Sequence, residues 1–86
     1  MKVRIPTPLR SYTADRSVVE AQGATVAAVL ADLDASHPGL RFRMVDEQGR
    51  LRPHMKVFVN DEATRDLDAP VADSDELTIM QALSGG

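Results

Sequence analysis

The chain of 86 residues has no cysteine and no tryptophan, and aromatic residues make up only 3% of it. The absence of cysteine excludes a disulfide scaffold, a thiolate metal site and a cysteine nucleophile. The scarcity of aromatic rings argues against a surface that stacks nucleobases. A formal net charge of −3 points the same way, because binding of nucleic-acid phosphates needs clustered lysine and arginine. We therefore expect no nucleic-acid partner.

Long apolar runs are also missing. No segment approaches the roughly 20 apolar residues that a membrane-spanning helix needs, and residues 1–4 are not followed by the apolar stretch of a signal peptide. We expect a cytoplasmic protein with no membrane partner. Hydrophobic residues make up 43% and charged residues 27% of the chain, which is typical of a folded domain, and this length allows one domain.

Four segments have the pattern of short strands. Residues 2–5, 55–59 and 77–80 alternate apolar and polar side chains, and residues 17–21 hold an adjacent apolar pair. Pro6 and Pro8 end the first strand because proline cannot donate to a sheet. Residues 9–15, which follow, are expected to form a loop.

One helix is predicted by apolar residues that recur at the spacing of a single helix face. These residues are Val26, Val29, Leu30 and Leu33. Thr25 precedes them as a candidate N-cap, and Pro38 and Gly39 are stop signals, so the helix should span residues 26–35. For residues 40–45 the pattern leaves a short helical turn and an irregular segment open.

The order strand, strand, helix, strand, strand predicts an α+β fold. One helix would cover one face of a single mixed sheet of about four strands, and the return of the helix into the sheet makes a right-handed crossover. This is the ubiquitin-like β-grasp arrangement. The rival, a ferredoxin-like plait, needs a second full helix for which residues 40–45 are too short. We place the domain at residues 1–81 and a flexible tail at residues 82–86.

The chain ends on Gly85-Gly86, shortly after the last predicted strand. Glycine has no Cβ, so such an end can enter a channel too narrow for any side chain. The terminal carboxylate of Gly86 is then the only reactive group there, and adenylation with ATP would make it an acyl donor to a sulfur or amine nucleophile. At ~3.3–3.6 Å per extended residue the tail after residue 81 could reach roughly 20 Å, which is enough to place Gly86 inside another protein.

Over its whole length the chain resembles the MoaD/ThiS family of ubiquitin-like sulfur carrier proteins. The residues that carry the resemblance are Thr25-Val26, His37-Pro38-Gly39, Val57 to Asp61, Asp73 to Ile79 and Gly85-Gly86. The resemblance implies that an E1-like enzyme adenylates Gly86 and that a sulfurtransferase or sulfide then gives a thiocarboxylate. Ser84 and Gly85 would enter the partner with Gly86. A biosynthetic enzyme would accept the sulfur.

In this interpretation the chain is a protein co-substrate and not an enzyme. It would bind no cofactor, and ATP would be used by the activating partner. The opening segment, Ile5 to Arg10, is similar to the branch of the family that serves cysteine synthesis. The alternatives are a ubiquitin-like modifier joined through Gly86 to target lysines, the small subunit of molybdopterin synthase, and a passive interaction module.

Two further groups of residues are candidates for sites. Phe58 and Met80 alternate with the apolar residues that should face the helix, so we expect them on the uncovered face of the sheet as a partner interface. The alternative is that the loop after Asp61 folds over them. His37 and His54 lie in different segments without a cluster of ligands, so we expect no metal site.

Overall fold

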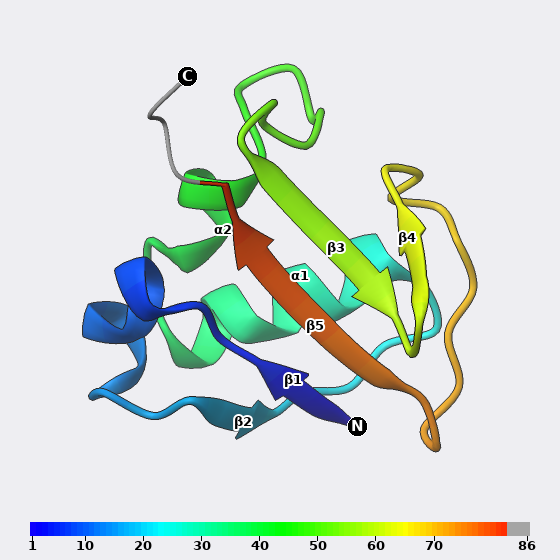
Figure 1. Cartoon of the computed structure of the whole chain (residues 1–86), viewed down its shortest axis with the longest axis horizontal. Helices are drawn as coiled ribbons and strands as arrows, with labels where there is room; N and C mark the ends of the chain where they lie inside the picture. The colour runs from blue at the N-terminus through cyan, green and yellow to red at the C-terminus, as the bar shows by residue number, and fades with distance from the viewer. Residues whose placement is uncertain (83–86) are drawn as a thin grey trace.

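The computed structural model describes residues 1–82 of the chain (Figure 1). Its elements are β1 (Lys2–Arg4), the 3-10 helix η1 (Thr7–Thr13), β2 (Val18–Glu20), α1 (Val26–Ser36), α2 (Leu40–Met44), β3 (Met55–Val59), β4 (Glu62–Thr64) and β5 (Glu76–Gln81). The strands form one sheet in the order β2-β1-β5-β3-β4. β1 and β5 are parallel and the other neighbours are antiparallel. The predicted α+β fold with a single mixed sheet is confirmed.

The central strand, β5, defines two ends of the sheet (Figure 1). Gln81, at the end of β5, pairs with Met55 at the start of β3, and η1 and α2 lie at this end. We call it the tail end. Glu76, at the start of β5, pairs with Lys2, and the N-terminus and the β3–β4 turn lie beside it. We call this the far end.

Helix α1 packs on one face of the sheet, within one residue of the predicted range. The side chain of Thr25 caps it by accepting a hydrogen bond from the Ala28 N–H at 3.1 Å. The predicted helix face is buried, and it meets buried side chains of β1, β3 and β5. These core residues are Val26, Val29, Leu30, Leu33, Val3, Val57, Leu77 and Ile79. Burial of each such side chain contributes about 1.5–3 kcal/mol to folding.

The structure corrects the expected loop at residues 9–15, since residues 7–13 form the 3-10 helix η1. Pro8 lies in its first turn, where a missing N–H costs nothing. Leu9 and Thr13 are buried, and the Thr13 hydroxyl lies 2.8 Å from the carbonyl of Arg16. Contacts with the core therefore stabilise this helix, and its sequence has no apolar periodicity that would predict it.

Two other short elements complete the fold. Residues 40–44 form the helix α2, which settles the open alternatives for this segment, and its Leu40 and Met44 are buried. The fifth strand, β4, pairs with β3 from Val57–Thr64 to Val59–Glu62 and was not predicted. Its residues Glu62, Ala63 and Thr64 include no large apolar side chain, so they show no strand pattern. No helix among residues 1–82 is long and apolar enough to cross a membrane.

Candidate functional site

The point where the tail leaves the domain is defined by one backbone contact. β5 ends at Gln81, and the N–H of Ala82 donates to the carbonyl of His54 at 2.7 Å. The chain therefore leaves the sheet beside the loop that precedes β3. The predicted site residues Ser84, Gly85 and Gly86 lie outside the described residues, so their roles stay predictions.

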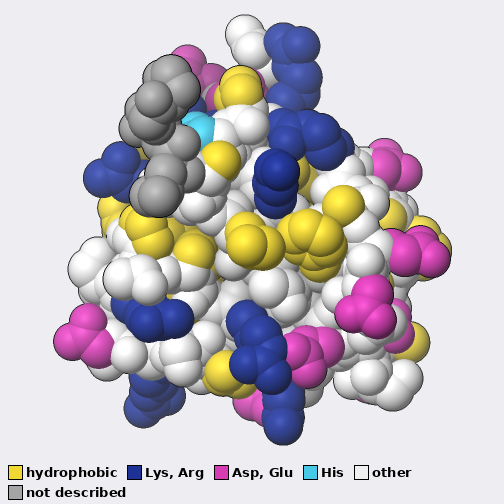
Figure 2. Space-filling model, in the orientation of Figure 1, with side chains coloured by type: hydrophobic (Ala, Val, Ile, Leu, Met, Phe, Trp, Pro, Cys, Tyr) yellow, Lys and Arg dark blue, Asp and Glu magenta, His cyan; other side chains and the backbone are white. Residues whose placement is uncertain are grey.

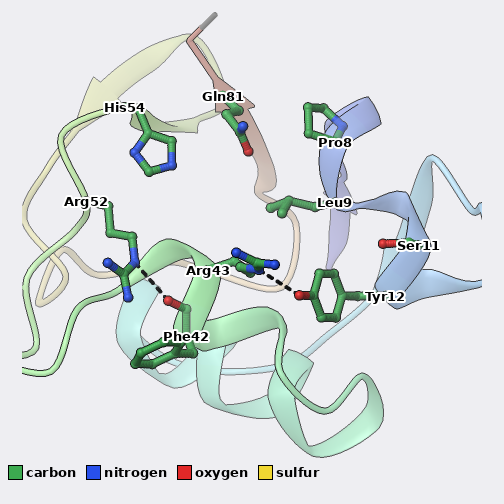
Figure 3. A pocket seen from close by; sticks show the side chains of 9 residues that line it. All are labelled: Pro8, Leu9, Ser11, Tyr12, Phe42, Arg43, Arg52, His54 and Gln81. Carbon is green, nitrogen blue, oxygen red and sulfur yellow. Dashed lines mark hydrogen bonds between the residues drawn. The ribbon is translucent and has the colours of Figure 1, made fainter. Parts of the chain in front are cut away.

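A cavity of about 460 Å³ lies at this point, between η1, α2 and the end of β5 (Figure 3). We call it the tail-end groove. Its lining residues come from four separate segments of the chain. They are Pro8, Leu9, Ser11, Tyr12, Phe42, Arg43, Arg52, His54 and Gln81.

Two arginines of the groove are each held by an aromatic residue (Figure 3). The Nε of Arg43 donates to the hydroxyl of Tyr12 at 2.7 Å, and this bond raises the pKa of the Arg43 guanidinium above its usual value. The guanidinium of Arg52 lies 4.7 Å from the centre of the Phe42 ring, and its Nε donates to the Phe42 carbonyl at 2.8 Å. Both side chains are therefore oriented cations.

The loop that carries Arg52 is tied down by Arg65, which follows β4. Its Nη1 donates to the carbonyl of Met55 at 2.9 Å. Its Nη2 lies 2.8 Å from the carbonyl of Leu51 and 3.1 Å from that of Arg52. Within the loop, the Asp46 carboxylate accepts from the N–H groups of Arg50 and Gln48, which lowers the pKa of Asp46.

Helix α2 places Phe42 and Arg43 on the surface, because Leu40 and Met44, four residues apart, take up its buried side. Gly39 before it has a positive φ of 94°, and a Cβ there would lie 3.1 Å from the Tyr12 ring. The predictions did not include Phe42 or Arg43 as site residues. The sequence signal that could have found them is the apolar pair Leu40 and Met44 at helical spacing. Because this pair is on the buried side of the helix, the residues between its members point outward.

The uncovered face of the sheet carries the predicted interface residues. Met80 is 49% exposed and Phe58 is half-buried beside Ala63 of β4, with which it pairs. The loop after β4 does not fold over them: the Leu67 carbonyl accepts from the Ala27 N–H at 2.8 Å, on the side of the sheet covered by α1. Figure 2 shows a band of apolar side chains across this face. That a partner binds there stays a prediction.

At the far end, side chains pair with one another. The Asn60 side chain donates to the Asp75 carboxylate at 3.0 Å and accepts from the Glu76 N–H at 3.0 Å. Asp75 also accepts from the Ala72 N–H at 2.8 Å, and this bond is the main reason why the pKa of Asp75 is lowered. Arg4 forms an ion pair with Glu76.

Basic and acidic residues are also distributed unevenly along the chain. Residues 41–56, which build much of the tail end, contain five lysines and arginines and two acidic residues. Residues 57–82 contain seven acidic residues and one arginine. The net charge of −3 for the whole chain is therefore compatible with a basic surface at the root of the tail.

Comparison with known proteins gives full-length matches. A profile of the ThiS family matches residues 3–86. The sulfur carrier protein CysO of Mycobacterium tuberculosis is 39% identical over 89 residues, which cover 98% of this chain and 96% of that protein. The small archaeal modifier protein 1 of Haloferax volcanii is 34% identical over 88 residues, which cover 100% of both chains.

Solved structures agree with the sequence matches. A chain of the Amycolatopsis orientalis BexX/CysO complex superposes with a TM-score of 0.92 at 43% identity, covering 99% of this chain and 98% of that one. CysO of M. tuberculosis superposes with a TM-score of 0.90 at 38% identity, covering 95% of this chain and 98% of that one. The predicted β-grasp fold is confirmed, and the chain belongs to the ThiS family.

Proposed function

We propose that this protein is a sulfur carrier that transports sulfur as a thiocarboxylate on its C-terminal glycine. The observation that carries the proposal is the similarity, over 98% of the chain, to a protein named a sulfur carrier. The Gly85-Gly86 end supports it, because only glycine leaves the terminal carbonyl open to a nucleophile within a narrow channel.

The proposed chemistry has two steps at the carbonyl carbon of Gly86. First, the carboxylate attacks the α-phosphate of ATP held by an E1-like partner, which gives the acyl adenylate and pyrophosphate. Second, sulfide attacks the carbonyl; where a sulfurtransferase supplies the sulfur as a persulfide, a thiol must reduce it to release sulfide. The C–O bond to AMP breaks, AMP leaves, and the thiocarboxylate remains. The chain is the substrate of these steps, and its partners are the catalysts.

Binding energy for these partners must come largely from the folded domain. Ordering the tail costs about 1–2 kcal/mol of backbone entropy per residue, so Ser84, Gly85 and Gly86 add little affinity. The uncovered face with Met80 and Phe58 offers apolar area beside the strand that leads into the tail. The BexX/CysO complex is a case in which a similar protein assembles with another protein.

The proposed acceptor of the sulfur is a biosynthetic enzyme of the cysteine type. The resemblance of residues 5–10 to the cysteine-synthesis branch of the family supports this choice. In that case the thiocarboxylate sulfur bonds to the β-carbon of an activated serine derivative, the bond from that carbon to the activating group breaks, and the group leaves, which joins the amino acid to Gly86 as a thioester. Incubation of the thiocarboxylated protein with such an enzyme and its substrate tests the assignment, through a rise in the protein mass by the added amino acid.

Intact mass spectrometry tests the proposed function itself. After incubation with an E1-like enzyme, ATP and sulfide, the protein mass should rise by the difference between sulfur and oxygen. The variant that lacks Gly86 is the matched control and should stay unmodified. An unchanged mass in the full chain, or the same shift in the control, contradicts the proposal.

A ubiquitin-like modifier is the second candidate, because the small archaeal modifier protein 1 is 34% identical over the full length. Both functions begin with adenylation of Gly86 and differ in the nucleophile. A modifier would form an isopeptide bond with lysine side chains of other proteins. Peptide mass spectrometry of the conjugates, or their absence under conditions that produce the thiocarboxylate, separates the two.

A further inference from the structure

The tail-end groove contains two oriented guanidinium groups that form no ion pair among the described residues, although the charge of Arg52 contributes to the lowered pKa of Asp46. Among residues 1–82, the ion pairs join Arg4 with Glu76 and the N-terminus with Glu20, both outside the groove. Arg43 and Arg52 each use Nε for a hydrogen bond, to Tyr12 and to Phe42 respectively. Within these described residues the Nη atoms of both arginines have no hydrogen-bond partner.

This arrangement differs from that of the other arginine at the tail end. Arg65 uses both Nη atoms on carbonyl oxygens of the neighbouring loop and thus serves the fold. Arg43 and Arg52 are instead held against aromatic rings, each through a hydrogen bond from its Nε (Figure 3). A side chain that is already oriented loses less entropy when a ligand binds.

We propose that the tail-end groove is a docking site for aspartate or glutamate side chains of the E1-like enzyme that activates the tail. This inference rests on the proposed function. The outer edge of a guanidinium presents paired N–H groups that match a carboxylate. Two such groups therefore fit a protein segment that carries at least two acidic side chains.

A protein ligand suits the groove better than a free anion. Pro8 and the Phe42 ring, which is 57% exposed, add apolar surface that a small anion would leave uncovered. Gln81 also lines the groove, one residue before the chain leaves the domain. Any protein that receives the tail must therefore cover the groove, and acidic side chains on it would meet Arg43 and Arg52.

The double variant R43Q/R52Q tests this site by titration against the activating enzyme. Its Kd should rise at least about tenfold at low salt, and the difference from the wild type should shrink at high salt as screening increases. The matched control is K2Q/R16Q, which removes the same charge from exposed positions outside the groove. A control that weakens binding as much as R43Q/R52Q overturns the proposal.

Two further measurements keep the test specific. Thermal melts must show that R43Q/R52Q is folded; if it is not, R43K/R52K retains the charge but loses the paired N–H geometry and should weaken binding about threefold or more. Competition by millimolar inorganic phosphate that equals the effect of the double variant would indicate a small-anion site and overturn the protein assignment.

Modification at saturating protein concentration separates this proposal from the proposed function. R43Q/R52Q should still acquire the thiocarboxylate when the activating enzyme is saturated, because saturation compensates for a raised Kd. If the wild type binds in a groove-dependent way but is never modified, the proposed function fails and the docking site stands. If modification proceeds and Kd is unchanged, the docking site fails alone.

Discussion

The two ends of the sheet use arginine and acidic residues in opposite ways. At the far end, Arg4 pairs with Glu76, and Asn60 joins Asp75 to the start of β5. At the tail end, Arg43 and Arg52 contact aromatic rings and form no ion pair among the described residues. The far end thus pairs an arginine with a carboxylate, whereas the tail end holds its arginines against aromatic rings.

This difference indicates a division of labour in a small domain. Side-chain hydrogen bonds at the far end hold the β3–β4 turn against β5 and so fix the strand that leads to the tail. The tail end is built from short helices and a loop held by Arg65, and it surrounds the root of the tail. One end holds neighbouring strands together, and the other is the end at which we propose recognition.

Replacement of Leu30 by alanine should destabilise both ends of the sheet and have the largest effect of the changes predicted. Leu30 of α1 is 1% exposed in the common core, so its truncation should cost about 2–5 kcal/mol of unfolding free energy. Urea denaturation measures this loss. The volume-conserving control Leu30→Met should cost less than about 1.5 kcal/mol; equal losses would mean that packing volume at this position is not the cause.

Replacement of Arg65 by alanine should weaken the tail end alone. Its guanidinium binds backbone carbonyls of Leu51, Arg52 and Met55, and hydrogen bonds of charged groups contribute about 1.5–3 kcal/mol each at most. Amide hydrogen exchange should accelerate in residues 45–54 and not around Asn60. Arg50→Ala, which removes one bond to Gln48, is the control; uniform acceleration in both regions would refute a local role.

Truncation on the uncovered face should affect binding more than folding. Met80→Ala and Phe58→Ala are expected to weaken binding of the activating enzyme by ~1 kcal/mol or more. Val18→Ala is the matched control, because Val18 is an exposed apolar residue on the distant strand β2. Calorimetric titration and a thermal melt test this prediction. Unchanged affinity would mean that this face does not bind the enzyme, and a large loss of melting temperature would mean that the residue belongs to the core.

Neutralisation of Asp75 at the far end should have the smallest effect. The pKa of Asp75 is lowered chiefly by the Ala72 N–H and also by Asn60, so its ionised form stabilises the folded state. That stabilisation is complete above the ordinary pKa of about 4 and is lost as pH falls through the lower folded value. The melting temperature of Asp75→Asn should thus fall less than that of the wild type below about pH 4; parallel curves would contradict this.

The sequence predicted the elements with a strong local signal. The face formed by Val26, Val29, Leu30 and Leu33 predicted α1, and alternation predicted β3 and β5. The segments η1, α2 and β4 have three to seven residues, and such short elements carry too few periods to be distinguished from loops. Tertiary contacts stabilise them instead.

The groove was not predicted because its contacts join distant parts of the chain. Tyr12 and Arg43 are 31 positions apart, and no local pattern predicts that their side chains meet. The proposed reacting end could be singled out from the sequence alone, since Gly85-Gly86 needs no partner residue to be recognised. Its role stays a prediction because it lies outside the described residues.

The central claim is that the domain binds and the tail reacts. The measurement that tests it most directly is titration of the activating enzyme with the variant that lacks Gly85 and Gly86. The account predicts a Kd within about tenfold of the full chain, a difference of less than about 1.4 kcal/mol, with an unchanged melting temperature and no thiocarboxylate. Loss of binding by more than about a hundredfold, with the domain still folded, would contradict it.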